Sequence, residues 1–341
     1  MKEQNYSPIV ERRLQVLDLA EKLGNISEAC RNSGMNRSSF YGWKKRYERF
    51  GVDGLFDLPS TPKHNPRTTP ESVVKKIVDV SIENPAWGCI HIAEELERQG
   101  ITISSPTVQK ILIKNGIATI KDRWNRLEFM NIKQGFQLGK EKIRRCEKLN
   151  PAFKERNFRL VRPGQTLSAD VYYAGTHPVL GRLYLSAVVD AYSSFAFADI
   201  SQSESAEELA YLLHVRVFPF FNSKRIRVGA LVSGSGPKFV SHSSPVKTYL
   251  RLNRVEHIES RNKKPATNGF VEKFKHIFLD EFLKKAIKSG KHQTLEALCY
   301  DFETWLSGYN YERPNNGFPN FGETPAGRFN RGENISLSMD A

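Results

Sequence analysis

Residues 183–190, Leu-Tyr-Leu-Ser-Ala-Val-Val-Asp, form an apolar run that ends in a carboxylate. An apolar run of this length is typical of a strand buried on both faces of a sheet. Residues 167–173, which precede it, form a second candidate strand with Asp170 in its middle. Gly175 and Pro178 lie between the two segments and permit a hairpin turn. This stretch therefore predicts the beginning of a β-sheet.

The pattern continues toward the C-terminus with strands and helices in alternation. We expect strands at 194–200, 226–232 and 254–258, and helices at 204–215, at 245–252 and from Asn268 onward. The resulting order, β-β-β-α-β-α-β-α, predicts a five-stranded mixed sheet with helices on its faces. It does not reveal the order of the strands within the sheet.

The N-terminal part of the chain is helical in pattern. Residues 11–23 carry an apolar helical stripe, Ser27 is a candidate cap for a short second helix, and a third helix begins near Asn36 after a turn at Gly34. Three helices with a glycine turn before the last are typical of a helix-turn-helix domain. The third helix would bring to a DNA groove Arg37, Ser38, Ser39, Tyr41, Lys44, Lys45 and Arg46.

Two points about this third helix bear on the structure. Phe40 and Trp43 lie three residues apart, so we expect both to face the core of the domain. A three-helix bundle with a solvated basic face would give the same pattern without DNA binding. We favour DNA binding because the basic residues fall on the helix that the motif presents to the groove.

The remaining segments complete a multi-domain organisation in which all-α units precede an α/β core. Four prolines in residues 56–70 indicate an extended linker. We expect a helix-turn-helix domain at 1–55, the linker at 56–70, a second helix-turn-helix unit at 71–118, a basic connector at 119–160, the α/β core at 161–290, and a C-terminal helix and tail at 291–341. The connector, which includes Arg123, is either a helix that touches DNA or a solvated arm.

The charge balance indicates a polyanionic partner. The chain has 51 Lys and Arg against 37 Asp and Glu, a net charge of +14, of which +10 falls in residues 1–160. A soluble protein with a basic surface is the alternative. The four cysteines form no Cys-x-x-Cys pair, which argues against a zinc ribbon or a disulfide framework. No apolar run approaches the ~20 residues that span a bilayer, so we expect a cytoplasmic, nucleoid-associated protein without a membrane partner.

Several ordered motifs resemble one family over roughly residues 15–330. They are Ala169-Asp-Val-Tyr-Tyr with the strand at 183–190, then Pro265-Ala-Thr-Asn-Gly-Phe-Val-Glu, and the tail Trp305-Leu-Ser-Gly-Tyr-Asn-Tyr-Glu-Arg-Pro followed by Gly322-Glu-Thr-Pro. The chain resembles bacterial insertion-sequence transposases with a retroviral-integrase-like, RNase H-like core of the DDE type. The resemblance implies DNA integration or transposition. It also implies binding to double-stranded element ends or inverted repeats, and a homodimer or larger assembly.

The resemblance further implies a metal-dependent site. Three acidic residues in that family hold two Mg²⁺ or Mn²⁺ ions, which promote in-line attack on a phosphodiester. Asp170 matches the first acidic position and Glu272 the third. Lys263 and Lys264 lie next to this motif and are expected to contact the DNA backbone, unless they belong to a merely solvated loop.

The second acidic position lacks a carboxylate. Residues 231–239 are Leu-Val-Ser-Gly-Ser-Gly-Pro-Lys-Phe, and aligning Gly236 and Phe239 with the family motif sets Gly234 where the family has Asp. Between Gly234 and Glu272 lie 37 residues, close to the family spacing. Glycine offers no ligand, so metal binding should be weakened. Asp190 or Glu259 could substitute for the missing carboxylate.

Three functions remain open from the sequence. The chain is a catalytically impaired transposase relative that still binds DNA, an active transposase that recruits a substitute ligand, or a non-enzymatic DNA-binding regulator derived from one. Whether it acts as a DDE-type polynucleotidyl transferase with an incomplete acidic triad is therefore left to experiment.

Overall fold

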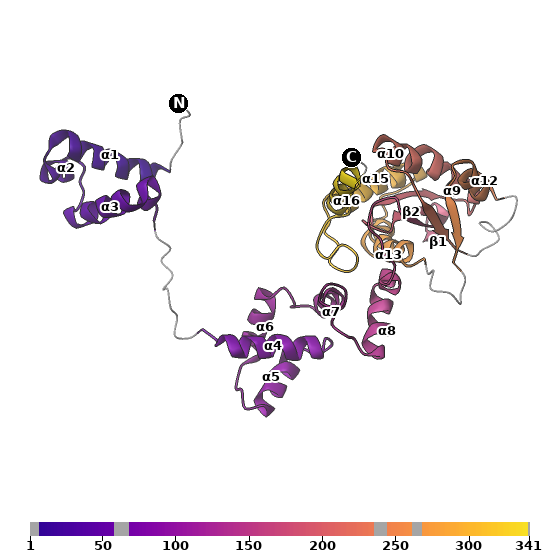
Figure 1. Ribbon diagram of the computed structural model, residues 1–341, viewed down its shortest axis with the longest axis horizontal. Coiled ribbons are helices and arrows are strands. Elements are labelled where there is room, and N and C mark those ends of the chain that lie inside the picture. The colour runs from indigo at the N-terminus through magenta and orange to yellow at the C-terminus, as the bar shows by residue number, and fades with distance from the viewer. Residues whose placement is uncertain (1–6, 58–67, 235–243, 261–267, 340–341) are drawn as a thin grey trace. The chain divides into compact units, whose positions relative to one another are not determined.

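The computed structural model describes residues 7–57, 68–234, 244–260 and 268–339. Its contacts divide the chain into two compact units, residues 1–69 and 70–341. The first unit has a small core of its own, and the second has two larger apolar clusters. Figure 1 shows the helical N-terminal unit and the sheet of the larger unit. The finer division into six segments remains a prediction. No helix among the described residues combines the length and the apolar character needed to cross a membrane.

The N-terminal unit consists of α1 (Pro8–Leu23), α2 (Ile26–Asn32), α3 (Arg37–Phe50) and the 3₁₀ turn η1 (Gly51–Leu55). Phe40 is 2% exposed and packs with residues of α1 and α2. The cap of α2 is Asn25, whose side chain accepts from the backbone N–H groups of Ser27 and Glu28. The expectation that Ser27 caps this helix was therefore wrong, because the asparagine two residues earlier already satisfies those donors.

Trp43 differs from the expectation that it faces the core. It is half-buried on α3, and the guanidinium of Arg13 lies 4.8 Å from the centre of its ring. Arg13 also donates to the backbone oxygen of Leu55 at 2.6 Å. The indole therefore packs beneath a cation that joins α1 to η1, outside the apolar cluster around Phe40.

The larger unit begins with the three predicted helices α4 (Glu71–Glu83), α5 (Cys89–Arg98) and α6 (Ser105–Lys114). Ile77, Ile92 and Leu112 are fully buried among them. The expected basic connector forms two helices, α7 (Ile120–Gln134) and α8 (Lys140–Leu149), followed by the 3₁₀ turn η2 (Pro151–Glu155).

One residue of the connector is not on the surface. Arg123 is 2% exposed, and its guanidinium donates to the backbone oxygens of Pro85, Trp87, Ile117 and Ala118. Neither alternative for the connector, DNA contact or solvation, therefore holds for Arg123. Its donors join α7 to the loop between α4 and α5 and to the residues that follow α6.

The sheet has five strands in the order β3-β2-β1-β4-β5. They are β1 (Thr166–His177), β2 (Gly181–Asp190), β3 (Ala196–Ser201), β4 (Ala230–Ser233) and β5 (Glu256–Glu259). β1–β2 and β2–β3 are antiparallel, whereas β1–β4 and β4–β5 are parallel. The predicted five-stranded mixed sheet is confirmed. Strands β4 and β5 begin later than expected.

Helices cover both faces of this sheet (Figure 1). On one face β1 and β4 pack with α9 (Ala206–Leu212), α10 (Phe218–Ser223) and α12 (Pro245–Leu252). On the other lie α13 (Gly269–Phe278), α15 (Leu295–Tyr311) and the short α14 (Lys284–Ser289). Short π-helical turns at 213–217 and 279–283 lengthen α9 and α13, and α16 (Pro325–Met339) follows α15. Phe302 and Tyr309 of α15 are buried core residues.

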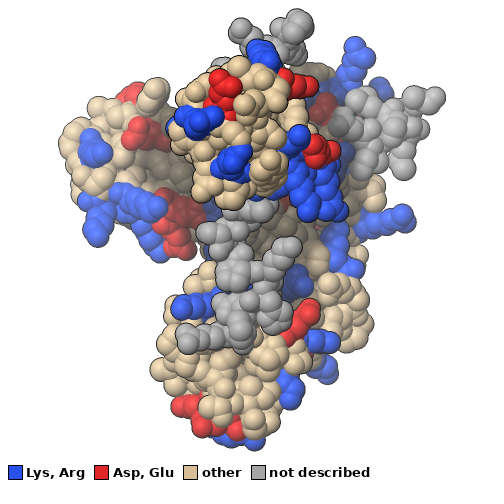
Figure 2. Space-filling model, turned by 90° about the vertical axis from the view of Figure 1, so that its left-hand side faces the viewer, with Lys and Arg blue, Asp and Glu red and all other residues tan. Residues whose placement is uncertain are grey.

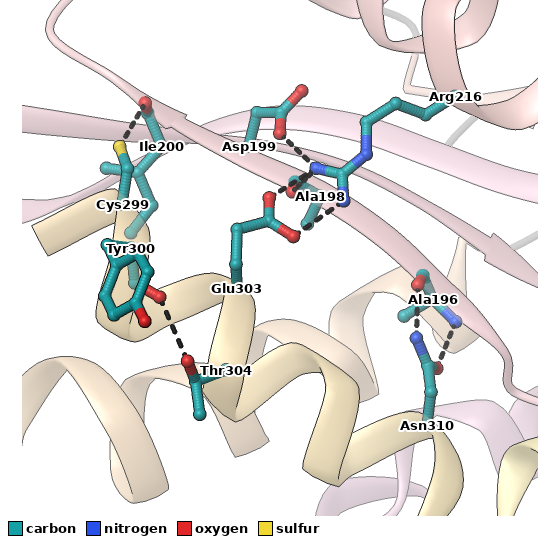
Figure 3. Close-up of polar contacts among 10 residues, drawn as sticks. All are labelled: Ala196, Ala198, Asp199, Ile200, Arg216, Cys299, Tyr300, Glu303, Thr304 and Asn310. Atoms are coloured by element: carbon teal, nitrogen blue, oxygen red, sulfur yellow. Dashed lines mark hydrogen bonds and ion pairs between the residues drawn. The ribbon is translucent and has the colours of Figure 1, made fainter. Parts of the chain in front are cut away.

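Side chains of α15 and of the π-helical turn at 213–217 cover the outer edge of β3 (Figure 3). Asn310 accepts from the N–H of Ala196 at 2.9 Å and donates to its oxygen at 2.8 Å. Arg216 donates to Asp199 and forms two bonds to the Glu303 carboxylate. These contacts satisfy part of the edge that an outermost strand leaves unpaired.

Candidate functional site

The candidate acidic site lies on the α13 face of β1. Successive residues of a strand alternate between faces. Leu167, Ala169 and Val171 pack in the cluster around α9, whereas Tyr172 packs in the cluster around α13. Asp170 therefore shares the α13 face with Tyr172. Burial, together with the nearby charge of Asp170, raises the pKa of Tyr172 well above its usual value.

Polar contacts set the position of α13 against that face. The Oγ of Ser168 donates to the side chain of Asn268 and accepts from the N–H of Val271. Asn268 also donates to the backbone oxygen of Ala169 at 2.6 Å. These bonds join the first turn of α13, which also carries Glu272, to the residues that precede Asp170 along β1.

Glu272 is paired with a cation in this structure. Its Oε2 lies 3.1 Å from Nζ of Lys154 in η2, and the two side chains are 43% and 34% exposed. The next residue, Glu155, accepts from the N–H of Gly269 at the start of α13. No local sequence pattern predicts the contact of Lys154, because 118 positions separate this residue from Glu272.

Gly234 lies next to Asp170 by strand register. β1 and β4 are parallel, with Ala169 paired to Ser233, so the following residues of the two strands are Asp170 and Gly234. Adjacent strands are about 4.8 Å apart. A side chain at position 234 would therefore extend beside that of Asp170, but glycine has none.

The residues present do not fit a two-metal centre. Within the described parts of the chain, no group of three or more His, Cys, Asp or Glu side chains could hold a metal ion. Two carboxylates, one of them already paired with a lysine, leave too little negative charge and too few ligands for two divalent cations.

Asp190 forms its hydrogen bonds away from Asp170, with Gly164 and Ser193. It is paired with Leu167, three positions before Asp170 along β1, and its side chain is fully buried. Its two oxygens accept from the N–H groups of Gly164 and Ser193, and from the Oγ of Ser193. It thus holds the turn after β2 together, about 10 Å along the strand from Asp170.

Glu259 lies on the wrong side of the sheet. Glu259 is on β5 and is paired with Ser233 of β4, so β4 separates it from β1. Ser233 and Leu231 share one face of β4, and Leu231 packs in the cluster around α9. Glu259 is therefore placed on the face opposite Asp170. His257 is on that same opposite face, where it contacts the Oγ of Ser233 at 2.8 Å.

The other predicted site residues lie mainly on α3. Arg37, Ser38, Ser39, Tyr41, Lys44 and Lys45 are exposed, and Arg46 is half-buried. Ser38 also contributes to the start of the helix, because its N–H and Oγ both donate to Asn36. Figure 2 shows that Lys and Arg side chains are prominent on the face that it presents. Lys263 and Lys264 lie outside the described residues.

Three protein families match parts of the chain. Residues 12–63 match a family described as Helix-turn-helix domain, residues 39–112 one described as Homeodomain-like domain, and residues 253–320 one described as Integrase core domain. The last range includes Glu272, α13 and α15. Protein YlbG of Escherichia coli strain K12 is 27% identical over 118 residues, which are 35% of this chain and 96% of YlbG.

Solved structures are similar at lower identity. The catalytic core domain of BIV integrase is 20% identical with a TM-score of 0.37, and the match covers 51% of this chain and 99% of that one. The catalytic core domain of HTLV-2 integrase, solved in complex with magnesium, is 15% identical with a TM-score of 0.37, over 50% of this chain and 99% of that one. Helix-turn-helix and homeodomain-like families thus match the N-terminal part of the chain, and an integrase core family matches residues 253–320.

Proposed function

We propose that this protein binds the ends of a transposable element through its helix-turn-helix domains, and that its integrase core is impaired in strand cleavage and transfer. Asp170 and Glu272 are the residues of the acidic site, and Gly234 occupies the position of the missing third carboxylate. Mg²⁺ or Mn²⁺ would bind such a site weakly, because one anionic ligand is lost. The protein is expected to act as a homodimer or larger assembly, since two DNA ends must be brought together.

The observation that carries this proposal is the register of β1 and β4. Position 234 is the neighbour of Asp170 on the adjacent strand, which is where a second carboxylate could share a cation with the first. The glycine there removes a ligand from the centre of the site rather than from its periphery.

An active enzyme with a substitute ligand is the second candidate function. The placement of Asp190 and Glu259 does not favour it: Asp190 is fully buried and bonded to a turn, and Glu259 is two strands away on the opposite face. A DNA-binding regulator derived from a transposase differs from the first proposal only in the DNA that it recognises, a promoter site instead of inverted repeats.

The test is a cleavage and strand-transfer assay on the element's terminal repeats with Mn²⁺. The natural protein is compared with Gly234→Asp, and with Gly234→Asp combined with Glu272→Gln as the control. We expect Gly234→Asp to be at least about 100-fold faster than the natural protein, the scale of losing one transition-state interaction, and the control to return to the natural rate. All three should bind the repeats equally. A natural protein as fast as Gly234→Asp would refute the impairment.

A further inference from the structure

The turn η2 is packed closely against the start of α13. The side chain of Glu155 accepts from the N–H of Gly269. A Cβ at Gly269 would lie 2.3 Å from the backbone oxygen of Pro151, so only glycine allows this approach. Because both ends of the turn contact α13, Lys154 is fixed to the same helix that carries Glu272.

Within this arrangement Lys154 brings a positive charge to the acidic site. Its Nζ lies 3.1 Å from Oε2 of Glu272. Where a carboxylate has been lost beside Asp170, a lysine thus neutralises one of the two that remain. A cation approaching Glu272 must displace the ammonium or share the carboxylate with it.

We propose that Lys154 is a built-in counter-cation that neutralises Glu272 in place of a divalent metal ion and lowers the affinity of the site for such ions. This inference rests on the proposed assignment of Asp170 and Glu272 to the acidic site. An ordinary surface ion pair is the competing explanation, and it differs in its consequence: it would have no effect on metal binding. Both side chains are partly exposed, so the pair can open and a metal ion can compete.

The first experiment measures Mn²⁺ binding to the full chain without DNA, from the electron paramagnetic resonance signal of the free ion. Lys154→Met is made in the natural protein and in Gly234→Asp. The matched control is Lys285→Met, which removes an exposed lysine of α14 from the same unit. We expect Lys154→Met to tighten Mn²⁺ binding about threefold to fivefold, the scale of a partly exposed ion pair, and Lys285→Met to change it less than about twofold.

The proposal would be overturned if Lys154→Met tightened Mn²⁺ binding in neither background. This includes the case in which no variant binds Mn²⁺ detectably. An equal effect of Lys285→Met would also overturn it. A second measurement examines the ion pair itself: the midpoints of thermal unfolding of Lys154→Met, Glu272→Gln and the double variant. A double variant whose midpoint shift equals the sum of the single shifts would show that the two side chains do not interact.

These outcomes are separable from those of the proposed function. DNA cleavage by the natural protein as fast as by Gly234→Asp would refute the impairment, but it would leave the Mn²⁺ comparison of Lys154→Met with its parent unaffected. Conversely, unchanged Mn²⁺ affinity would remove the role of Lys154 while rescue of cleavage by Gly234→Asp still stood.

Discussion

Asp190 is a buried carboxylate whose hydrogen bonds hold a turn together, and it does not belong to the acidic site. Burial raises its pKa to about 6, against the opposing effect of the hydrogen bonds from Ser193 and Gly164. A folded-state pKa above the unfolded value means that the folded protein binds the proton more tightly between these values. The contribution of Asp190 to stability therefore falls as pH rises from about 4 to about 6.

We expect this dependence to appear in a comparison with Asp190→Asn. The unfolding free energy of the natural protein relative to the variant should decrease by up to about 3 kcal/mol between pH 4 and pH 6.5, since one pKa unit corresponds to about 1.4 kcal/mol. Urea unfolding at the two pH values measures it. Glu207→Gln, which removes an exposed charge from α9, serves as the control. A difference that does not change with pH would contradict the assignment.

The hydrogen bonds between α15 and the edge of β3 contribute to stability, and this contribution can be measured. Asn310 is 5% exposed and satisfies both backbone groups of Ala196. Asn310→Ala would leave a buried N–H and a buried C=O without partners, at about 1–3 kcal/mol each. We expect a loss of about 2–4 kcal/mol in urea unfolding and increased light scattering from an exposed edge. Thr304→Ala on the same helix, which loses only a local bond to Tyr300 (Figure 3), should cost less than about 0.5 kcal/mol.

A second prediction concerns the exposed basic residues of α3 and their contact with DNA. Lys44 and Lys45 are exposed, so they can neutralise DNA phosphates. Replacing both with Gln should reduce the slope of log affinity against log salt by up to about 1.8, near 0.9 for each phosphate that is no longer neutralised. Fluorescence anisotropy on the terminal repeats across a salt series measures the slope. Lys22→Gln at the end of α1 is the matched control. An unchanged slope for Lys44 and Lys45 would support the solvated bundle.

Some features of these elements could be predicted from the sequence, and others could not. Periodicity predicted all five strands and the helices α9, α12 and α13 that pack on them, because each apolar pattern is local. It did not predict α10 or the two helices of the connector. The order β3-β2-β1-β4-β5 depends on pairing between distant segments and was not predictable from spacing. Arg123 and Trp43 were misjudged for a related reason: an arginine is buried only where distant carbonyl groups converge on it, and Trp43 is covered by Arg13 of another helix. Likewise, motif spacing located Asp170, Gly234 and Glu272, whereas the contact of Lys154 required the folded chain.

At the scale of the whole molecule, the two units have separate apolar cores. Phe40 belongs to the small cluster of residues 1–69, and Phe302 belongs to a cluster confined to the larger unit. Within the described residues, no apolar cluster includes members of both. A unit of fewer than about 70 residues is only marginally stable, and truncating a buried phenylalanine costs about 3–5 kcal/mol.

Phe40→Ala should therefore unfold the N-terminal unit while leaving the sheet intact. Differential scanning calorimetry of the full chain should lose or shift one transition and retain the other, and specific binding to the terminal repeats should fall to the level of nonspecific DNA. Phe302→Ala should give the reciprocal result, a lowered main transition with the N-terminal transition unchanged. If Phe40→Ala instead lowers both transitions together, the units unfold as one cooperative body, and DNA recognition cannot be separated from the stability of the integrase core.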